Sequence, residues 1–337
     1  MSNVFQDQIN VQQLDSHTYQ VGFDAEWAIG PMLHGGCVTA SVYAAAQKHF
    51  TSTLASRNQP DVHTLHIEFL RPVTLSVSTI KITDLKVGKG TNFIQLTLSQ
   101  NNESKCTALA TSTNFDVPLG PTATIDTSSP SAASLPGLCP IPDFKKIEAQ
   151  ERDPNWIPSK TVGELLPLLK RMTFLYPVPE SPPGILDFWI TFDAPEKFSG
   201  VHLAMLADMA ASPSDTLLRT GGTLDMHKIH AIKKDAWEKN PGKTLVGTNS
   251  VKEASKSQIW NSTLTIDVQF KRRVTGDVRW TFTRATTRML EGGRMDQDLD
   301  IRDENLKPLC LSRQVMLVID ARRRFKEKGG RGKGSNL

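Results

Sequence analysis

The chain lacks long apolar runs and has few cysteines. No stretch of about 18 consecutive apolar residues occurs, so we expect no membrane-spanning helix. The first residues, MSNVFQDQIN, have no basic flank and no apolar core, which argues against a secretory signal. The four cysteines are scattered, with no C-x-x-C pair and no histidine at metal-ligand spacing. Free thiols in a reducing compartment are predicted, and the cytoplasm is the expected location.

Several catalytic motifs are also missing. The sequence has no G-x-S-x-G, no G-x-x-x-x-G-K-[ST], no G-x-G-x-x-G after a strand and no H-E-x-x-H. These absences argue against a serine hydrolase, a nucleoside triphosphatase, a dinucleotide-dependent enzyme and a zinc protease. We predict no metal and no cofactor.

The composition of the 337 residues is that of a globular protein, with 39% hydrophobic and 22% charged residues, and the length predicts two domains. The net charge is +4, but residues 322–337 hold seven basic residues and one acidic residue, a charge of +6. The rest of the chain is therefore close to −2 (4 − 6). The Gly-rich tail, 321–337, is predicted to be disordered. Since no nucleic-acid-binding motif accompanies it, we predict no nucleic-acid partner.

Proline divides the chain. Six prolines lie among Ser, Thr and Ala in residues 116–144, which predicts a linker that extends to about residue 155. We therefore expect an N-terminal domain over 1–115 and a C-terminal domain over 156–320. The C-terminal domain would contain an insertion at about 212–257.

The two parts repeat one order of elements. In the first, a small-residue helix at 35–50 precedes alternating runs at 62–70, 78–86, 92–100 and 105–115. In the second, a strand at 185–192 and a helix at 201–211 precede strands at 258–270, 279–288, 294–302 and 308–320. The repeat predicts an α+β protein made of two similar units, each an antiparallel sheet curled around a long central helix.

Three polar residues stand out in the second part. Asp208 interrupts an apolar helix, where burial would raise its pKa toward the range of a useful base. A solvated helix end is the alternative. Thr263 lies on an alternating strand. Its neighbours on that strand, Leu264, Ile266 and Val268, are expected to face the other way. Gln314, in a late strand, would need partners for its amide if it faced the core, whereas an outward-facing Gln would need none.

In the first part, His34, Gly35 and Gly36 mark the start of the helix. Exposed N–H groups at such a start can bind an oxyanion or a phosphate. A tight turn into a packed helix is the alternative.

These elements resemble the double-hotdog acyl-CoA thioesterase II (TesB-like) family, in its fungal and bacterial thioesterase-like branch. The strand 63–72, HTLHIEFLRP, is similar to the H-S-x-H-x-x-F-L-R-P of the family. The segment 33–37, LHGGC, resembles the Gly-Gly helix start of the family, and 206–208, LAD, resembles the position of its catalytic Asp. The resemblance covers about residues 15–115 and 180–320. One departure is Arg273-Val274, where the family usually has Pro after its second F-x-R.

The resemblance implies hydrolysis of an acyl thioester, presented by CoA or by a carrier protein, without a covalent intermediate. Asp208, Thr263 and Gln314 would hold the attacking water, and His34, Gly35 and Gly36 would bind substrate or oxyanion. A further pairing into homo-oligomers is also implied.

Two other functions remain open from the sequence. A cyclase, isomerase or dehydratase of a biosynthetic pathway could use Asp208 as a base on the same fold, although His202 is six residues away and weakens the dehydratase version. A non-catalytic acyl-binding module is the third alternative. The last residues, 335–337, are SNL, close to the peroxisomal SKL, so the peroxisome is the alternative location.

Overall fold

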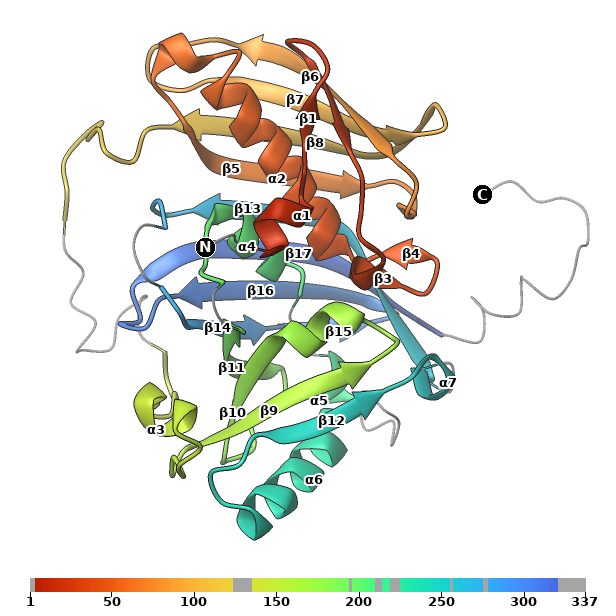
Figure 1. Ribbon diagram of the computed structural model, residues 1–337, viewed down its shortest axis with the longest axis vertical. Coiled ribbons are helices and arrows are strands. Elements are labelled where there is room, and N and C mark those ends of the chain that lie inside the picture. Colours follow the sequence, from red (N-terminus) through yellow and green to blue (C-terminus); the bar gives the residue numbers. More distant parts are fainter. Residues whose placement is uncertain are drawn as a thin grey trace, which may run out of the picture.

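A continuous 15-stranded sheet runs through both halves of the chain. The computed structural model describes residues 4–123, 135–193, 196–209, 214–218, 225–254, 257–274 and 278–320. We call the described residues up to 123 the N-terminal half and those from 135 onward the C-terminal half. Figure 1 shows the N-terminal half (red to yellow) above the C-terminal half (green to blue).

The N-terminal half curls its strands against one long helix, α2 (Gly35–Thr51). Ala40, Ala45 and Ala46 of α2 are fully buried, and their small side chains let the helix backbone approach its neighbours closely. The strand order is β2-β6-β7-β8-β5. The bounds are β2 (Thr18–Val21), β5 (Asp61–Phe69), β6 (Ser78–Lys86), β7 (Phe93–Gln100) and β8 (Glu103–Thr113), with α1 (Val4–Gln8), β1 (Gln12–Gln13), β3 (Ala28–Ile29) and β4 (Met32–Leu33) before α2 or at its start.

The C-terminal half repeats this arrangement around a shorter helix, α4 (Gly200–Leu206). The strand order is β13-β17-β16-β14-β11-β10-β9-β12. The strands are β9 (Trp156–Gly163), β10 (Met172–Pro177), β11 (Ile185–Phe192), β12 (Leu245–Asn249), β13 (Ile259–Phe270), β14 (Thr281–Thr286), β15 (Leu290–Glu291), β16 (Arg294–Arg302) and β17 (Pro308–Asp320). The other α-helices are α3 (Phe144–Glu148), α5 (Ser214–Leu217), α6 (Met226–Lys239) and α7 (Val251–Ala254).

The two halves meet along β5 and β13, which pair antiparallel with Ile67 opposite Ile266. Behind this pair α2 packs against α4, and one apolar cluster holds core residues of both halves. Arg273 also joins the halves. Its guanidinium donates to both carboxylate oxygens of Asp61 at 2.8 and 2.7 Å and to Asp116 at 2.5 Å. The residue that departs from the family pattern therefore closes the seam between the halves.

The architecture predicted from the sequence is confirmed, with three differences. The two expected sheets are one sheet, because β5 and β13 hydrogen-bond to each other. The second central helix ends at Leu206 rather than at residue 211. Strands β9 and β10 were not predicted, and the insertion supplies β12, which adds to β9 in parallel at the edge of the sheet.

The described residues include no helix long and apolar enough to cross a membrane. The four cysteines are free, as predicted. The tail 321–337, with its terminal Ser-Asn-Leu, lies outside the described residues.

Candidate active site

The start of α2 is one wall of the candidate site. His34 is the N-cap, and its Nδ1 accepts the N–H of Gly36 at 3.0 Å. Burial lowers the pKa of His34 to about 4, so the ring is neutral and can accept this hydrogen bond. A Cβ on Gly36 would collide with the carbonyl oxygen of Met205 in α4. Glycine at this position therefore lets the two central helices touch backbone to backbone.

Asp208 lies opposite, in the turn that follows α4. Its Oδ2 occupies the space that a Cβ on Gly35 would fill, and its Oδ1 accepts the Thr263 hydroxyl at 2.8 Å. The carboxylate of the C-terminal half therefore sits against the first residue of the helix of the N-terminal half. A helix N-terminus stabilises negative charge, so the position suits a carboxylate that must ionise to work.

The surroundings of Asp208 tune its acidity. Burial raises its pKa to about 7, although the hydrogen bond from Thr263 opposes the rise. The residue keeps partial solvent accessibility, so water can reach it. A carboxyl group with a pKa near neutrality can take a proton from water and give it back within one reaction cycle. Asp208 does lie at the helix end, but its carboxylate is hydrogen-bonded and partly buried there, not freely solvated.

Cys37, the residue after Gly36 in α2, is not available as a nucleophile. Burial and the charge of Asp208 both raise the pKa of its thiol above the usual range, so the thiol stays protonated.

Thr263 reaches Asp208 because of a β-bulge. The pairing of β13 with β17 shifts between Thr263 and Thr265, which makes Leu264 the extra residue. The bulge turns Thr263 to the same side as the buried Ile266 and Val268, which face the core around α4. The expectation that Ile266 and Val268 face away from Thr263 is therefore wrong, because simple alternation holds only in a strand without a bulge.

Gln314 contacts the backbone at the C-terminal end of α4, next to Asp208. The side chain is buried, and its amide Nε2 donates to the carbonyl oxygen of Ala207, which also accepts the Ser312 hydroxyl at 3.4 Å. Its Oε1 has no hydrogen-bond partner among the described residues. Gln314 thus fixes the residue before Asp208 and has one acceptor left, and its predicted contact with the attacking water stays a prediction. Ser312 was missed, because a single Ser in an alternating strand carries no signal.

His202 does not face this site. Its Nδ1 lies 2.8 Å from the Ser199 hydroxyl and its Nε2 lies 3.1 Å from Glu196 Oε1. Both ring nitrogens are therefore engaged at the other end of α4, away from Asp208.

A small recess, with a cavity volume of about 30 Å³, opens in the C-terminal half between α6, β10 and β11. Its lining combines apolar side chains such as Tyr176, Leu186 and Met226 with polar ones such as Glu180 and His227. Lys233 Nζ lies 3.6 Å from the centre of the Tyr176 ring, and burial lowers the pKa of this lysine to about 7.

One row of buried residues across the sheet lies between the recess and the site. Leu186 pairs with Ala285, Ala285 with Leu299, and Leu299 with Ser312. All four residues are buried, and Ser312 contacts the Ala207 carbonyl. Three strand spacings, about 14 Å, therefore separate the recess from the turn that carries Asp208.

Two family models match the chain. The acyl-CoA thioesterase N-terminal domain matches residues 23–114, and the acyl-CoA thioesterase C-terminal domain matches residues 147–318. A thioesterase-like protein of Talaromyces wortmannii is 26% identical over 352 aligned positions, which cover 99% of this chain and 97% of that protein.

Solved structures agree in fold. A hot dog fold protein from Alicyclobacillus acidocaldarius matches with a TM-score of 0.59 at 16% identity, covering 95% of this chain and 99% of that one. An acyl-CoA thioesterase II from Mycobacterium marinum matches with a TM-score of 0.57 at 15% identity, covering 94% of this chain and 97% of that one.

The chain belongs to the acyl-CoA thioesterase family, with the N-terminal and C-terminal domains of that family in one polypeptide. Its fold is the double hotdog, and it is a thioester hydrolase.

Proposed function

We propose that this protein hydrolyses an acyl thioester by direct attack of a water molecule that Asp208 activates. The observation that carries the proposal is the placement of Asp208, a carboxyl with a pKa of about 7, between the Thr263 hydroxyl and the first residue of α2. Water would give a proton to Asp208 as its oxygen bonds to the thioester carbon. When the tetrahedral intermediate collapses, the C–S bond breaks and the thiolate takes the proton back, leaving a carboxylic acid and a free thiol.

The oxyanion of this intermediate would lie at the start of α2. The N–H of Gly36 already donates to His34, so we assign the oxyanion to the N–H of Gly35, which as the first helical residue has no acceptor within the helix. Gln314 would position the turn that carries Asp208, and its free Oε1 would accept a hydrogen bond from the water.

The acyl chain would enter at the recess between α6, β10 and β11, whose cavity of about 30 Å³ would have to widen to hold it. The recess lies at one end of the buried row of residues that ends beside Asp208. Replacing Leu186 by Trp would fill it, and we expect the preferred acyl chain to become shorter. The substrate would be an acyl-CoA or an acyl group on a carrier protein.

The first experiment is thiol release from a panel of acyl-CoAs of increasing chain length, by the wild type and by Asp208→Asn. We expect kcat to fall at least ~100-fold in the variant, the low end for loss of a general base. Tyr43→Phe is the matched control, because Tyr43 of α2 lies beside Gly200, the first residue of α4, as Asp208 lies beside Gly35. This variant removes a hydroxyl from the corresponding position in the N-terminal half, and its kcat should stay within about threefold of the wild type. Turnover that survives in Asp208→Asn would refute the assignment of the base, and no turnover by the wild type on any acyl-CoA would refute acyl-CoA as the substrate.

A further inference from the structure

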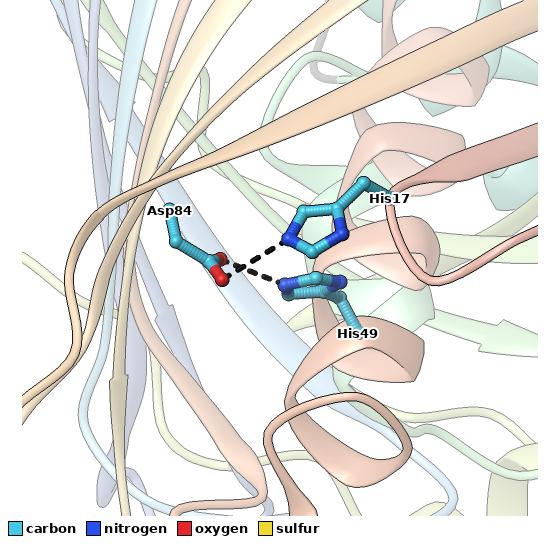
Figure 2. A group of neighbouring side chains, drawn as sticks. All are labelled: His17, His49 and Asp84. Carbon is cyan, nitrogen blue, oxygen red and sulfur yellow. Dashed lines mark hydrogen bonds and ion pairs between the residues drawn. The ribbon is translucent and has the colours of Figure 1, made fainter.

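Two histidines and an aspartate meet at the far end of α2. His17 precedes β2, His49 lies in the last turns of α2, and Asp84 is in β6. His17 Nε2 is 3.1 Å from Asp84 Oδ2, and His49 Nε2 is 2.9 Å from Asp84 Oδ1. Figure 2 shows both imidazole rings directing a nitrogen at the same carboxylate. Three segments far apart in the sequence thus bring two ring nitrogens and a carboxylate oxygen within 4.8 Å of one another.

The second nitrogen of each ring is also held. His17 Nδ1 lies 2.8 Å from the Ser16 hydroxyl, and His49 Nδ1 lies 3.0 Å from the hydroxyl of the buried Tyr19. Metal-binding histidines are oriented in this way, because a hydrogen bond at one ring nitrogen fixes the ring and leaves the other nitrogen to the ion. Tyr19 and His49 are both fully buried, so this part of the cluster is rigid.

The spacing and exposure of the three side chains suit a small transition-metal ion. Bonds of about 2.0–2.1 Å in a tetrahedral zinc site place neighbouring ligand atoms about 3.3 Å apart. The 3.1 and 2.9 Å separations in the cluster are close to that value. His49 is buried, whereas the side chains of His17 and Asp84 are 41% and 23% exposed, so the ion can enter from solvent and keep a water as its fourth ligand.

Imidazole nitrogen with carboxylate oxygen is a donor set that favours zinc and its neighbours in the first transition row over magnesium or calcium, which prefer oxygen alone.

We propose that His17, His49 and Asp84 bind a divalent transition-metal ion of the zinc type, which ties the strand after His17, the end of α2 and β6 together. His49 is fourteen residues along α2 from Gly35, about 21 Å at the rise of an α-helix. The ion is therefore remote from Asp208 and serves the N-terminal half as a structural clamp. This site is independent of the proposed thioester chemistry.

The test uses the full chain without a polyhistidine tag, stripped with a chelator and titrated with Co²⁺ by visible absorption and with Zn²⁺ by calorimetry. We expect one equivalent of either ion to bind in the wild type and the melting temperature to rise with metal. His17→Asn and Asp84→Asn should each weaken binding at least ~10-fold and lose the rise in melting temperature. Tyr19→Phe, which releases His49, should weaken binding about 10–100-fold.

His66→Asn is the matched control. His66 also contacts two carboxylates, but Asp267 lies at its Nδ1 and Glu68 at its Nε2, on different sides of the ring, so the three cannot converge on one ion. This variant should bind metal as the wild type does. Thioesterase activity in the metal-free state should stay within about twofold in His17→Asn, which separates loss of metal from loss of fold.

Three results would overturn the proposal. The wild type could bind less than one equivalent of Co²⁺ and Zn²⁺, His17→Asn could bind as tightly as His66→Asn, or the site could prefer Mg²⁺ or Ca²⁺. Any of these would leave the cluster as a hydrogen-bonded clamp in which both imidazoles donate an N–H to Asp84.

Discussion

The two halves of the molecule use the same contact for different purposes. Each central helix begins with a glycine that touches a side chain belonging to the other helix segment. Gly35 of α2 faces Asp208, eight residues after Gly200, whereas Gly200 of α4 faces the Tyr43 ring, eight residues after Gly35. Where the C-terminal half has a carboxylate, the N-terminal half has a phenol ring.

The strands repeat this difference. Pairing shifts at a bulge between Val62 and Thr64 in β5, as it does between Thr263 and Thr265 in β13. Val62 therefore corresponds to Thr263. In the same way Ala110, which pairs with Leu65, corresponds to Gln314, which pairs with Ile266. The N-terminal half has Tyr, Val and Ala where the C-terminal half has Asp, Thr and Gln, so the shared geometry belongs to the fold and the polar residues belong to the proposed site.

The largest expected effect comes from adding a methyl group to one of the two glycines. Gly35→Ala would displace the Asp208 carboxylate, and we expect kcat to fall about 100-fold, as for a reacting group moved by about an ångström. Gly200→Ala would displace Tyr43 instead, lowering stability while kcat stays within about threefold. Thiol-release kinetics and thermal unfolding of both variants measure the contrast. Equal losses of kcat would show that the two contacts are not different in function.

Removing the charge of Asp208 should stabilise the protein at high pH. The folded-state pKa of about 7 lies above the unfolded value of 3.8, so the folded chain binds the proton more tightly and its stability falls as pH rises from about 4 through 7. At pH 8 we expect the free energy of unfolding of Asp208→Asn to exceed that of the wild type by about 1–3 kcal/mol. This difference should shrink toward pH 5. Denaturant titrations of the wild type and Asp208→Asn at both pH values test this. In the control Tyr43→Phe, the difference in unfolding free energy from the wild type should be the same at both pH values.

Thr263 should set the pH at which the enzyme becomes active. Because the base must be ionised, kcat/KM should rise with pH through about 7 in the wild type. Thr263→Val removes the hydrogen bond that favours the charged form of Asp208, so the pKa of Asp208 rises. The rising limb of the kcat/KM profile should therefore move to higher pH by about one unit. Thr265→Val, on the other side of the bulge, should leave the profile unchanged. A limb that does not move would mean that a different group controls it.

Gln314 should have the smallest effect of the series. Gln314→Leu removes the hydrogen bond to Ala207 and frees the turn before Asp208, for which we expect kcat to fall about five- to tenfold. Gln297→Leu is the matched control, because Gln297 is also a buried glutamine with an unpartnered Oε1 and pairs with Gln314 across β16 and β17. If both variants lose activity equally, core packing rather than positioning explains the loss.

Local pattern made much of the fold predictable. Strands such as 78–86 and 294–302 alternate over most of their length and lie where the alternation places them. Strands β9 and β10 contain proline and pack buried residues on both faces, so they show no alternation to detect. The helix after Gly200 ends at Leu206, and the carbonyl of its C-cap residue Ala207 accepts two side chains from β17, a contact that no sequence window contains.

The residues of the candidate site could be proposed from the sequence and its resemblance, but their arrangement could not. Asp208, Thr263 and Gln314 were named from the sequence, and the structure brings Asp208 and Thr263 into contact. The bulge that turns Thr263 inward depends on pairing with β17. The histidine and aspartate cluster of α2 escaped prediction, because His17, His49 and Asp84 come from three elements with no ligand-spacing motif.

Joining two hotdogs in one chain has a consequence for how such an enzyme can change. In a symmetric homodimer, one substitution alters both sites at once, so exchanging a catalytic aspartate for tyrosine removes all activity. Here the polypeptide between the halves makes the two positions genetically separate. The Tyr43 ring can pack opposite Gly200 while Asp208 stays opposite Gly35. The fused chain can thus keep one working centre and use its twin for stability.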